Sequence, residues 1–202
     1  SITINSFGFR GDEFSSIKPS DMYRILMVGG STMFGAGASS DETTIPGYLQ
    51  QFLNEKDFGF DIEVINSGIQ GADSNTESNL IEQKLVRFSP DLIIIYDGWN
   101  DLRGNNTPME VKENWETICE FGIENDFDVI ITLQPIAGFG NKVLTKQELK
   151  YAHTGEDYTN NPLIESSSIY QNYAKNLSEI TTCTETFDIR NVFDTETGPI
   201  YW

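Results

Sequence analysis

The chain has 202 residues, 38% of them hydrophobic and 12% aromatic, which is enough apolar material for one folded domain and unlike a disordered chain. Its 13 Lys and Arg against 31 Asp and Glu give a formal net charge of −18, so we expect no binding to nucleic acid or to an anionic membrane surface. No apolar run reaches the about 18 residues of a membrane span, and two cysteines cannot form a closed thiolate metal site. No metal and no cofactor is expected, and oligomeric state is not indicated.

The first half of the chain alternates apolar strands with amphipathic helices behind an N-terminal arm. Residues 1–22 are polar and irregular, and three phenylalanines are expected to anchor them to the domain: Phe7, Phe9 and Phe14. Strands are predicted over 23–28 and 62–65, and helices over 43–56 and 76–88. The inner faces of these helices are expected to carry Ile45, Leu49, Phe52 and Leu53 in the first and Ile81, Leu85 and Phe88 in the second.

The second half repeats the alternation. Strands are predicted over 92–96, which is apolar on both faces, and over 128–136, and helices over 109–125 and 167–180. Residues 138–165 are predicted to be a lid or loop with a short helix over 145–152, and no element is predicted in the tail after 186. The inner faces of the two long helices are expected to carry Val111, Trp115, Ile118 and Cys119, and Ile169, Tyr173, Leu177 and Ile180. This order predicts one doubly wound α/β domain, residues 1–202, with a mostly parallel sheet.

Three predicted strands end in small and polar residues. Because the carboxyl ends of parallel strands share one rim of the sheet, we expect Ser31, Gly71 and Asn100 to meet there. A serine can attack a carbonyl, and two or three fixed N–H donors can hold the oxyanion that forms. Ser31 alone would as readily cap a helix, but the three turns together favour acyl transfer.

These turns resemble the blocks of the SGNH (GDSL-type) hydrolase family. VGGST is similar to the first block, with Ser31 as nucleophile, INSGIQGADS to the second, with Gly71 as an oxyanion donor, and DGWND to the third, with Asn100 as another. The resemblance implies a flavodoxin-like three-layer α/β/α sandwich and cleavage of an ester through an acyl-serine. The neighbouring residues expected to contact the substrate are Gly30, Thr32, Trp99 and Asp101.

The chain departs from the family pattern at two places. Gly30 stands where the family has an Asp that is mainly structural, a change we expect to be minor. The family's C-terminal Asp-x-x-His, which supplies the general base, is absent, although GPIYW at 198–202 is similar to the stretch that leads into it. We therefore expect the natural chain to continue past Trp202 and this form to have little or no esterase activity. The single histidine, His153, is expected to be exposed in the predicted lid rather than catalytic.

Several alternatives stay open at this point. The same fold could serve as a non-catalytic domain that binds a ligand or partner, or as a sugar O-acyltransferase in which an alcohol replaces water. The expected substrate is a small-molecule, glycan or lipid ester, such as an acetyl ester. Cys119 and Cys183 could be separate buried thiols or a disulfide, and a disulfide would suit a secreted or anchored protein, a location favoured here over the cytoplasm.

Overall fold

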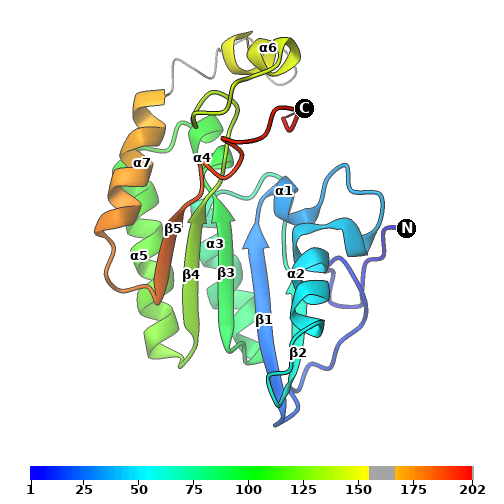
Figure 1. Ribbon diagram of the computed structural model, residues 1–202. Helices are drawn as coiled ribbons and strands as arrows, with labels where there is room; N and C mark the ends of the chain where they lie inside the picture. The colour runs from blue at the N-terminus through cyan, green and yellow to red at the C-terminus, as the bar shows by residue number, and fades with distance from the viewer. Residues whose placement is uncertain (155–166, 202) are drawn as a thin grey trace.

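A five-stranded parallel sheet runs through the centre of the protein in the order β2-β1-β3-β4-β5 (Figure 1). The computed structural model describes residues 1–154 and 167–201. The strands are β1 (Met22–Gly29), β2 (Asp61–Asn66), β3 (Leu92–Asp97), β4 (Asp128–Leu133) and β5 (Glu185–Asp188). The parallel α/β architecture predicted from the sequence is therefore confirmed.

Helices cover both faces of this sheet. The longer ones are α2 (Ile45–Asn54), α3 (Ser74–Leu80), α5 (Pro108–Glu124), α6 (Lys146–Thr154) and α7 (Ser167–Glu179). Short ones are α1 (Ser31–Phe34), α4 (Trp99–Gly104) and the 3₁₀ turn η1 (Asp41–Thr43). After α3 the chain stays helical through a π segment, η2 (Ile81–Leu85), and a 3₁₀ segment, η3 (Val86–Phe88).

The core is divided by the sheet into two clusters. Ile93 and Ile95 of β3 are fully buried on the face that α3, α5 and α7 cover, where Trp115 and Tyr170 also pack. On the opposite face, α2 covers a smaller cluster around Met33. Residues buried on alternate sides of one strand require cover on both faces, which produces the three layers.

Sequence signals at the helix ends explain where the helices begin. Thr44 accepts a hydrogen bond from the N–H of Gly47 at 3.1 Å, and Pro46 lies in the first turn of α2. Thr107 and Glu110 form a reciprocal capping box at the start of α5. These local signals account for the agreement of the main helices with their predicted ranges.

Two predicted inner-face residues are wrong, and several short elements were not predicted. Phe52 is 56% exposed, with the ammonium of Lys56 over its ring, because α2 covers only the edge of the sheet. Ile169 is 39% exposed, and its neighbour Tyr170 takes the inward position. The tail was expected to have no element but contains β5. The short helix α4, directly after β3, was not predicted either. The strand predicted over 128–136 ends earlier, at Leu133.

The N-terminal arm is anchored as predicted. Phe9 is 3% exposed, and the rings of Phe7, Phe9 and Phe14 lie 5.1, 5.9 and 5.2 Å from the ring of Phe88. This aromatic cluster attaches the arm to the helical segment after α3. The arm then runs toward the carboxyl end of β2, where Arg10 pairs with Asn66 as an isolated bridge.

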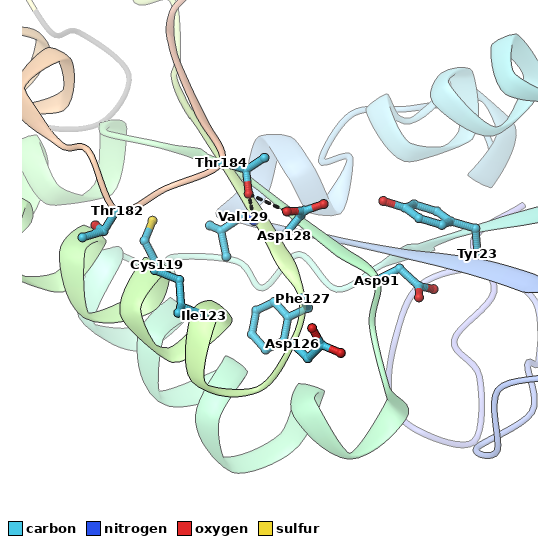
Figure 2. A pocket seen from close by; sticks show the side chains of 11 residues that line it. Tyr23, Asp91, Cys119, Ile123, Asp126, Phe127, Asp128, Val129, Thr182 and Thr184 are labelled. Carbon is cyan, nitrogen blue, oxygen red and sulfur yellow. Dashed lines mark hydrogen bonds between the residues drawn. The ribbon is translucent and has the colours of Figure 1, made fainter.

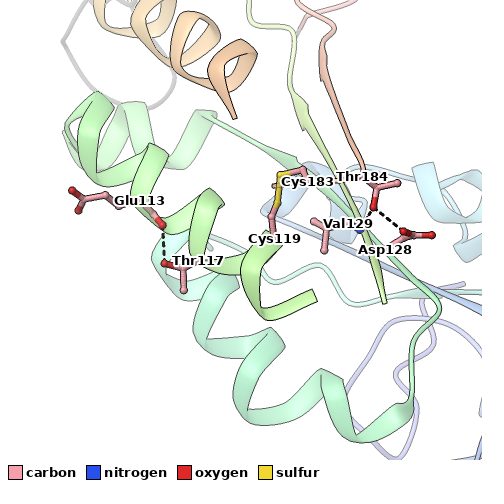
Figure 3. Close-up of a disulfide and its surroundings, with 7 residues drawn as sticks. All are labelled: Glu113, Thr117, Cys119, Asp128, Val129, Cys183 and Thr184. Atoms are coloured by element: carbon pink, nitrogen blue, oxygen red, sulfur yellow. Dashed lines mark hydrogen bonds between the residues drawn. A yellow bond between two sulfur atoms is a disulfide. The ribbon is translucent and has the colours of Figure 1, made fainter. Parts of the chain in front are cut away.

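A disulfide joins Cys119 of α5 to Cys183, which precedes β5 (Figure 3). The Cα atoms are 4.8 Å apart and 64 positions apart in the chain. Of the two alternatives left open by the sequence, the structure has the disulfide. Over the described ranges 1–154 and 167–201, no helix is both long and apolar enough to cross a bilayer.

Candidate active site

Ser31 lies where the chain leaves β1, as the first residue of α1. It lines a pocket of about 750 Å³ at the carboxyl ends of the strands, together with Thr32 and with Trp99 of α4. Two of the expected substrate-contacting residues, Thr32 and Trp99, thus line the same pocket as the predicted nucleophile. Its other walls include Ile45, Tyr96, Arg103, Gln134, Ile136, Gln147, Tyr151, Phe193, Ile200 and Tyr201.

Asn100 links the three sequence blocks. Its Nδ2 donates a hydrogen bond to the carbonyl oxygen of Ala72, next to Gly71, at 2.5 Å. A Cβ atom on Gly30 would lie 2.2 Å from the same nitrogen. The amide of Asn100 therefore rests against the backbone that precedes Ser31, and a side chain at position 30 would displace it. This contact gives a physical reason for glycine where the family pattern has Asp.

The loop that carries Gly71 packs directly on α1. Ile69 N–H donates to the carbonyl of Gly29 at 2.9 Å, and a Cβ on Gly68 would lie 2.3 Å from the nitrogen of Phe34. Gly71 itself has φ +80° and is exposed, with open space where a Cβ would be. Among the described residues, neither Gly71 nor Asn100 lines the pocket. The structure thus brings Gly71 and Asn100 to the same rim of the sheet as Ser31, beside the pocket and not in its lining.

Asp101 does not face the pocket, which corrects its assignment as a substrate contact. It is fully buried and accepts hydrogen bonds from Ser74 N–H at 3.0 Å, from Ser74 Oγ at 2.6 Å and from Asn106 Nδ2 at 2.8 Å. These bonds fasten α4 to the start of α3. Asp101 therefore holds the turn that presents Asn100, one residue earlier.

Two more buried carboxyls lie behind this turn. Asp97 accepts from Gly98 N–H at 2.6 Å and from Trp115 Nε1 at 2.8 Å, and burial together with the neighbouring Asp101 raises its pKa. Glu77 is fully buried, and neither of its oxygens has a hydrogen-bond partner within residues 1–154 and 167–201. Burial raises the pKa of Glu77 well above its ordinary value, and the charges of Asp97 and Asp101 add to this. In residues 1–154 and 167–201, no group of three His, Cys, Asp or Glu side chains is arranged to hold a metal ion.

Glu148 of α6 fixes the far wall of the pocket. Its Oε1 accepts from the backbone N–H groups of Ile200 and Tyr201 at 2.8 and 3.1 Å, and its Oε2 pairs with Lys142 at 3.0 Å. Burial opposes ionisation, but these bonds, with one from Thr145 N–H, lower the pKa of Glu148 to about 2. The carboxylate therefore stays charged at neutral pH and joins α6 to the tail, both of which line the pocket.

The general base has no assigned residue. His153 lies in α6, two positions after the pocket residue Tyr151, and its side chain is outside the described residues. The expectation that it is exposed is therefore untested. The last part of the predicted lid, from residue 155 to 165, also lies outside the described part.

A second hollow, of about 360 Å³, lies at the opposite edge of the sheet, beside the disulfide (Figure 2). Asp91 and Asp128 stand there at the amino ends of β3 and β4. Asp128 accepts a hydrogen bond from Thr184 Oγ1 at 2.8 Å, and Asp91 from the N–H of Arg24 at 2.7 Å. None of the predicted site residues lines this hollow.

The chain matches the model of a known protein family. The model of the GDSL-like lipase/acylhydrolase family matches residues 27–163, which include Ser31, Gly71 and Asn100. The fold and this match define an esterase-type hydrolase. The chain belongs to the GDSL-like lipase/acylhydrolase family, as its three blocks predicted. A comparison with curated proteins finds no match.

Solved structures share the fold. TesA superposes with a TM-score of 0.61 at 16% identity, covering 87% of this chain and 82% of its own. AlinE4, an SGNH-hydrolase family esterase, gives 0.60 at 15%, covering 91% and 88%. A catalytic mutant of Axe2, an acetylxylan esterase from Geobacillus stearothermophilus, gives 0.61 at 16%, covering 89% and 81%. The three-layer SGNH hydrolase fold is therefore confirmed.

The sequence interpretation missed the walls of the pocket. Tyr96 ends an apolar strand and was taken as core, and Phe193 and Tyr201 belong to the tail, where no element was predicted. The two aromatic residues of this stretch, Phe193 and Tyr201, were the one available signal. It could indicate a packed tail but not which pocket the tail would border.

Proposed function

We propose that this protein is a serine esterase in which Ser31 is the nucleophile and Asn100, with the N–H of Gly71, stabilises the oxyanion. The observation that carries this proposal is the contact of the Asn100 amide with the turn at Gly30, immediately before Ser31. Asn100 Nδ2 carries two hydrogens, and Ala72 accepts only one of them. The second has no acceptor within residues 1–154 and 167–201, and we assign it to the oxyanion formed on a substrate at Ser31.

The proposed reaction has two steps. The Oγ of Ser31 adds to the ester carbonyl carbon as its proton passes to a base, and the C–O bond to the alcohol then breaks, leaving an acyl-serine. Water adds to the acyl-serine and regenerates Ser31 by releasing the carboxylic acid. In both steps negative charge develops on the former carbonyl oxygen, and removing one fixed donor to such an oxyanion typically costs about 10²–10³ in rate.

The pocket supports an O-acyl ester of a carbohydrate or a lipid as substrate. Its lining combines aromatic rings, such as Trp99 and Tyr151, with the side-chain amides of Gln134 and Gln147. Apolar rings with a few polar groups are typical of sites for small ligands. The similarity to an acetylxylan esterase is in keeping with an acetylated sugar, and we place this class first.

The test is Ser31-dependent hydrolysis of p-nitrophenyl acetate by the whole chain, with and without added imidazole. Imidazole is included because no residue is assigned as base, and a serine without one is a weak nucleophile. In the unchanged chain we expect slow turnover that imidazole accelerates. In Ser31→Ala the rate with imidazole should equal the rate that imidazole gives without protein. Fluorophosphonate should label Ser31 only in the unchanged chain.

Three other results would redirect the proposal. Rapid turnover without imidazole that is lost in His153→Ala would make His153 the base and contradict its expected exposure. No Ser31-dependent turnover and no labelling under any condition would favour a non-catalytic binding domain. Addition of an alcohol that diverts the acyl group into a new ester would identify a transferase.

A further inference from the structure

The helix that presents Ser31 is too short to maintain its own conformation. α1 comprises four residues, Ser31–Phe34, and isolated helices of this length are unstable in water. The carbonyl of Ser31 accepts hydrogen bonds from the N–H groups of Gly35 and Ala36 at 3.0 and 2.9 Å. The position of Ser31 therefore depends on what holds Gly35 in place.

Arg10, from the N-terminal arm, holds it. Its Nη1 donates to the carbonyl oxygens of Phe34 and Gly35 at 3.2 and 2.7 Å, and its Nη2 donates to the carbonyl of Ser40 at 3.0 Å. Its Nε pairs with Asp41 at 2.7 Å. The side chain is 1% exposed, so water does not compete for these bonds.

Arg10 is itself fixed to the second sequence block. Its backbone pairs with Asn66 at the end of β2, and Asn66 Nδ2 donates to the same Phe34 carbonyl at 3.2 Å. A Cβ on Gly35 would lie 2.9 Å from Arg10 Nη1, so the guanidinium rests directly on this backbone. The arm, the Gly71 loop and α1 thus meet at one buried arginine.

We propose that Arg10 is a positioning residue for Ser31. It touches no reacting atom and lies outside the pocket lining among the described residues. It acts by holding the carboxyl end of α1, through which the backbone of Ser31 is bonded. The inference rests on the proposed function, because Ser31 must be the nucleophile for its placement to affect turnover.

The test compares Arg10→Lys with Arg24→Lys in the imidazole-supplemented p-nitrophenyl acetate assay. Arg24 is a matched control, because it is also fully buried and bonds one acid, Glu63, and two carbonyls, those of Phe88 and Ser15. It stands in the first half of β1, at the opposite end of the strand from Ser31. Lysine keeps the charge but loses the planar fork in both variants.

We expect Arg10→Lys to lower kcat by roughly 10- to 100-fold with KM changed less than about threefold, since a small displacement of a reacting group costs this much. Arg24→Lys should lower the melting temperature without lowering kcat. An unchanged kcat in folded Arg10→Lys, or an equal loss in Arg24→Lys, would overturn the proposal. If Arg10→Lys does not fold, Asp41→Asn, which changes the partly exposed partner of Arg10, should lower kcat in the same direction, and an unchanged kcat there would also overturn it.

A failure of the proposed function is separable from a failure of this inference. If the unchanged chain shows no Ser31-dependent turnover, amide hydrogen exchange decides the positioning. Faster exchange at Phe34, Gly35 and Ala36 in Arg10→Lys but not in Arg24→Lys would support it. Equal exchange in the two variants would overturn it.

Discussion

The side-chain amide of Asn100 donates a hydrogen bond to the carbonyl oxygen of Ala72 at 2.5 Å, across 28 positions of the chain. The bond fixes the rotamer of an amide that also rests against Gly30, next to the predicted nucleophile. It thereby converts three separate turns into one arrangement. An oxyanion donor held in advance of the reaction is more effective than one that must reorient during it.

Replacement of Asn100 by alanine should lower kcat by about 10²–10³ with little change in KM, because the amide acts on the oxyanion and not on the bound ester. Steady-state kinetics with imidazole measures both constants. Asn79→Ala is the matched control, since Asn79 is exposed on α3 and its side chain bonds, among the described residues, to Asn75 and Gln83 alone. An Asn100→Ala protein with unchanged kcat would remove Asn100 from the site.

Replacement of Gly30 by alanine should displace the Asn100 amide, because the new Cβ would lie 2.2 Å from Nδ2. We expect a loss of kcat similar to that of Asn100→Ala, and the double variant should be no slower than either single one, since both remove the same donor. Gly59→Ala provides the control, because alanine is strained at φ +75° but its Cβ meets no atom there, so this variant should lose stability without losing kcat. Additive losses in the double variant would contradict this explanation of Gly30.

Glu77→Gln should stabilise the protein above pH 5 and leave it unchanged near pH 4. The pKa of Glu77 is raised in the folded protein, so above the ordinary value of 4.5 the folded state binds more protons than the unfolded one and stability falls as pH rises. Glutamine removes this dependence. We expect a higher Tm than that of the unchanged chain at pH 8 and an equal Tm at pH 4, with roughly 2–4 °C for each kcal/mol of stabilisation.

Thermal unfolding at pH 4 and pH 8 tests this expectation. Glu82→Gln is the control, because it is the same substitution at an exposed position of the adjoining segment η2. A Glu77→Gln protein that is less stable at pH 8 would show that the carboxyl is ionised and has a partner.

Reduction of the Cys119–Cys183 disulfide should destabilise the protein by about 4 kcal/mol, as the loop-closure model gives for a separation of 64 residues. Urea unfolding with and without reductant measures the change. In the double variant Cys119→Ser with Cys183→Ser, reductant should not change the free energy of unfolding. Turnover at 25 °C should be unaffected while the protein stays folded, because the disulfide lies at the opposite edge of the sheet from Ser31.

The order of the first four strands and of the long helices was determined by the sequence alone. Apolar runs such as Leu92–Tyr96 and the 3.6-residue spacing around Trp115 are local patterns, and they correctly predicted four strands and the main helices. The three turn motifs also predicted the family, and the family model confirms that prediction. Local chemistry suffices for these features because each depends on residues only a few positions apart.

Features that depend on distant residues were decided only by the tertiary structure. Phe52 is exposed, and Tyr170 takes the buried position expected for Ile169, because the place of a helix over the edge or the centre of the sheet sets how wide a face it buries. β5 has only four residues and one partner strand, so its own sequence carries too weak a pattern to predict it. The pairing of Cys119 with Cys183 and the contact of Gly30 with Asn100 required the chain to fold first. The same holds for the hydrogen bond from the buried guanidinium of Arg10 to the Gly35 carbonyl at the end of α1, which joins residues 25 positions apart.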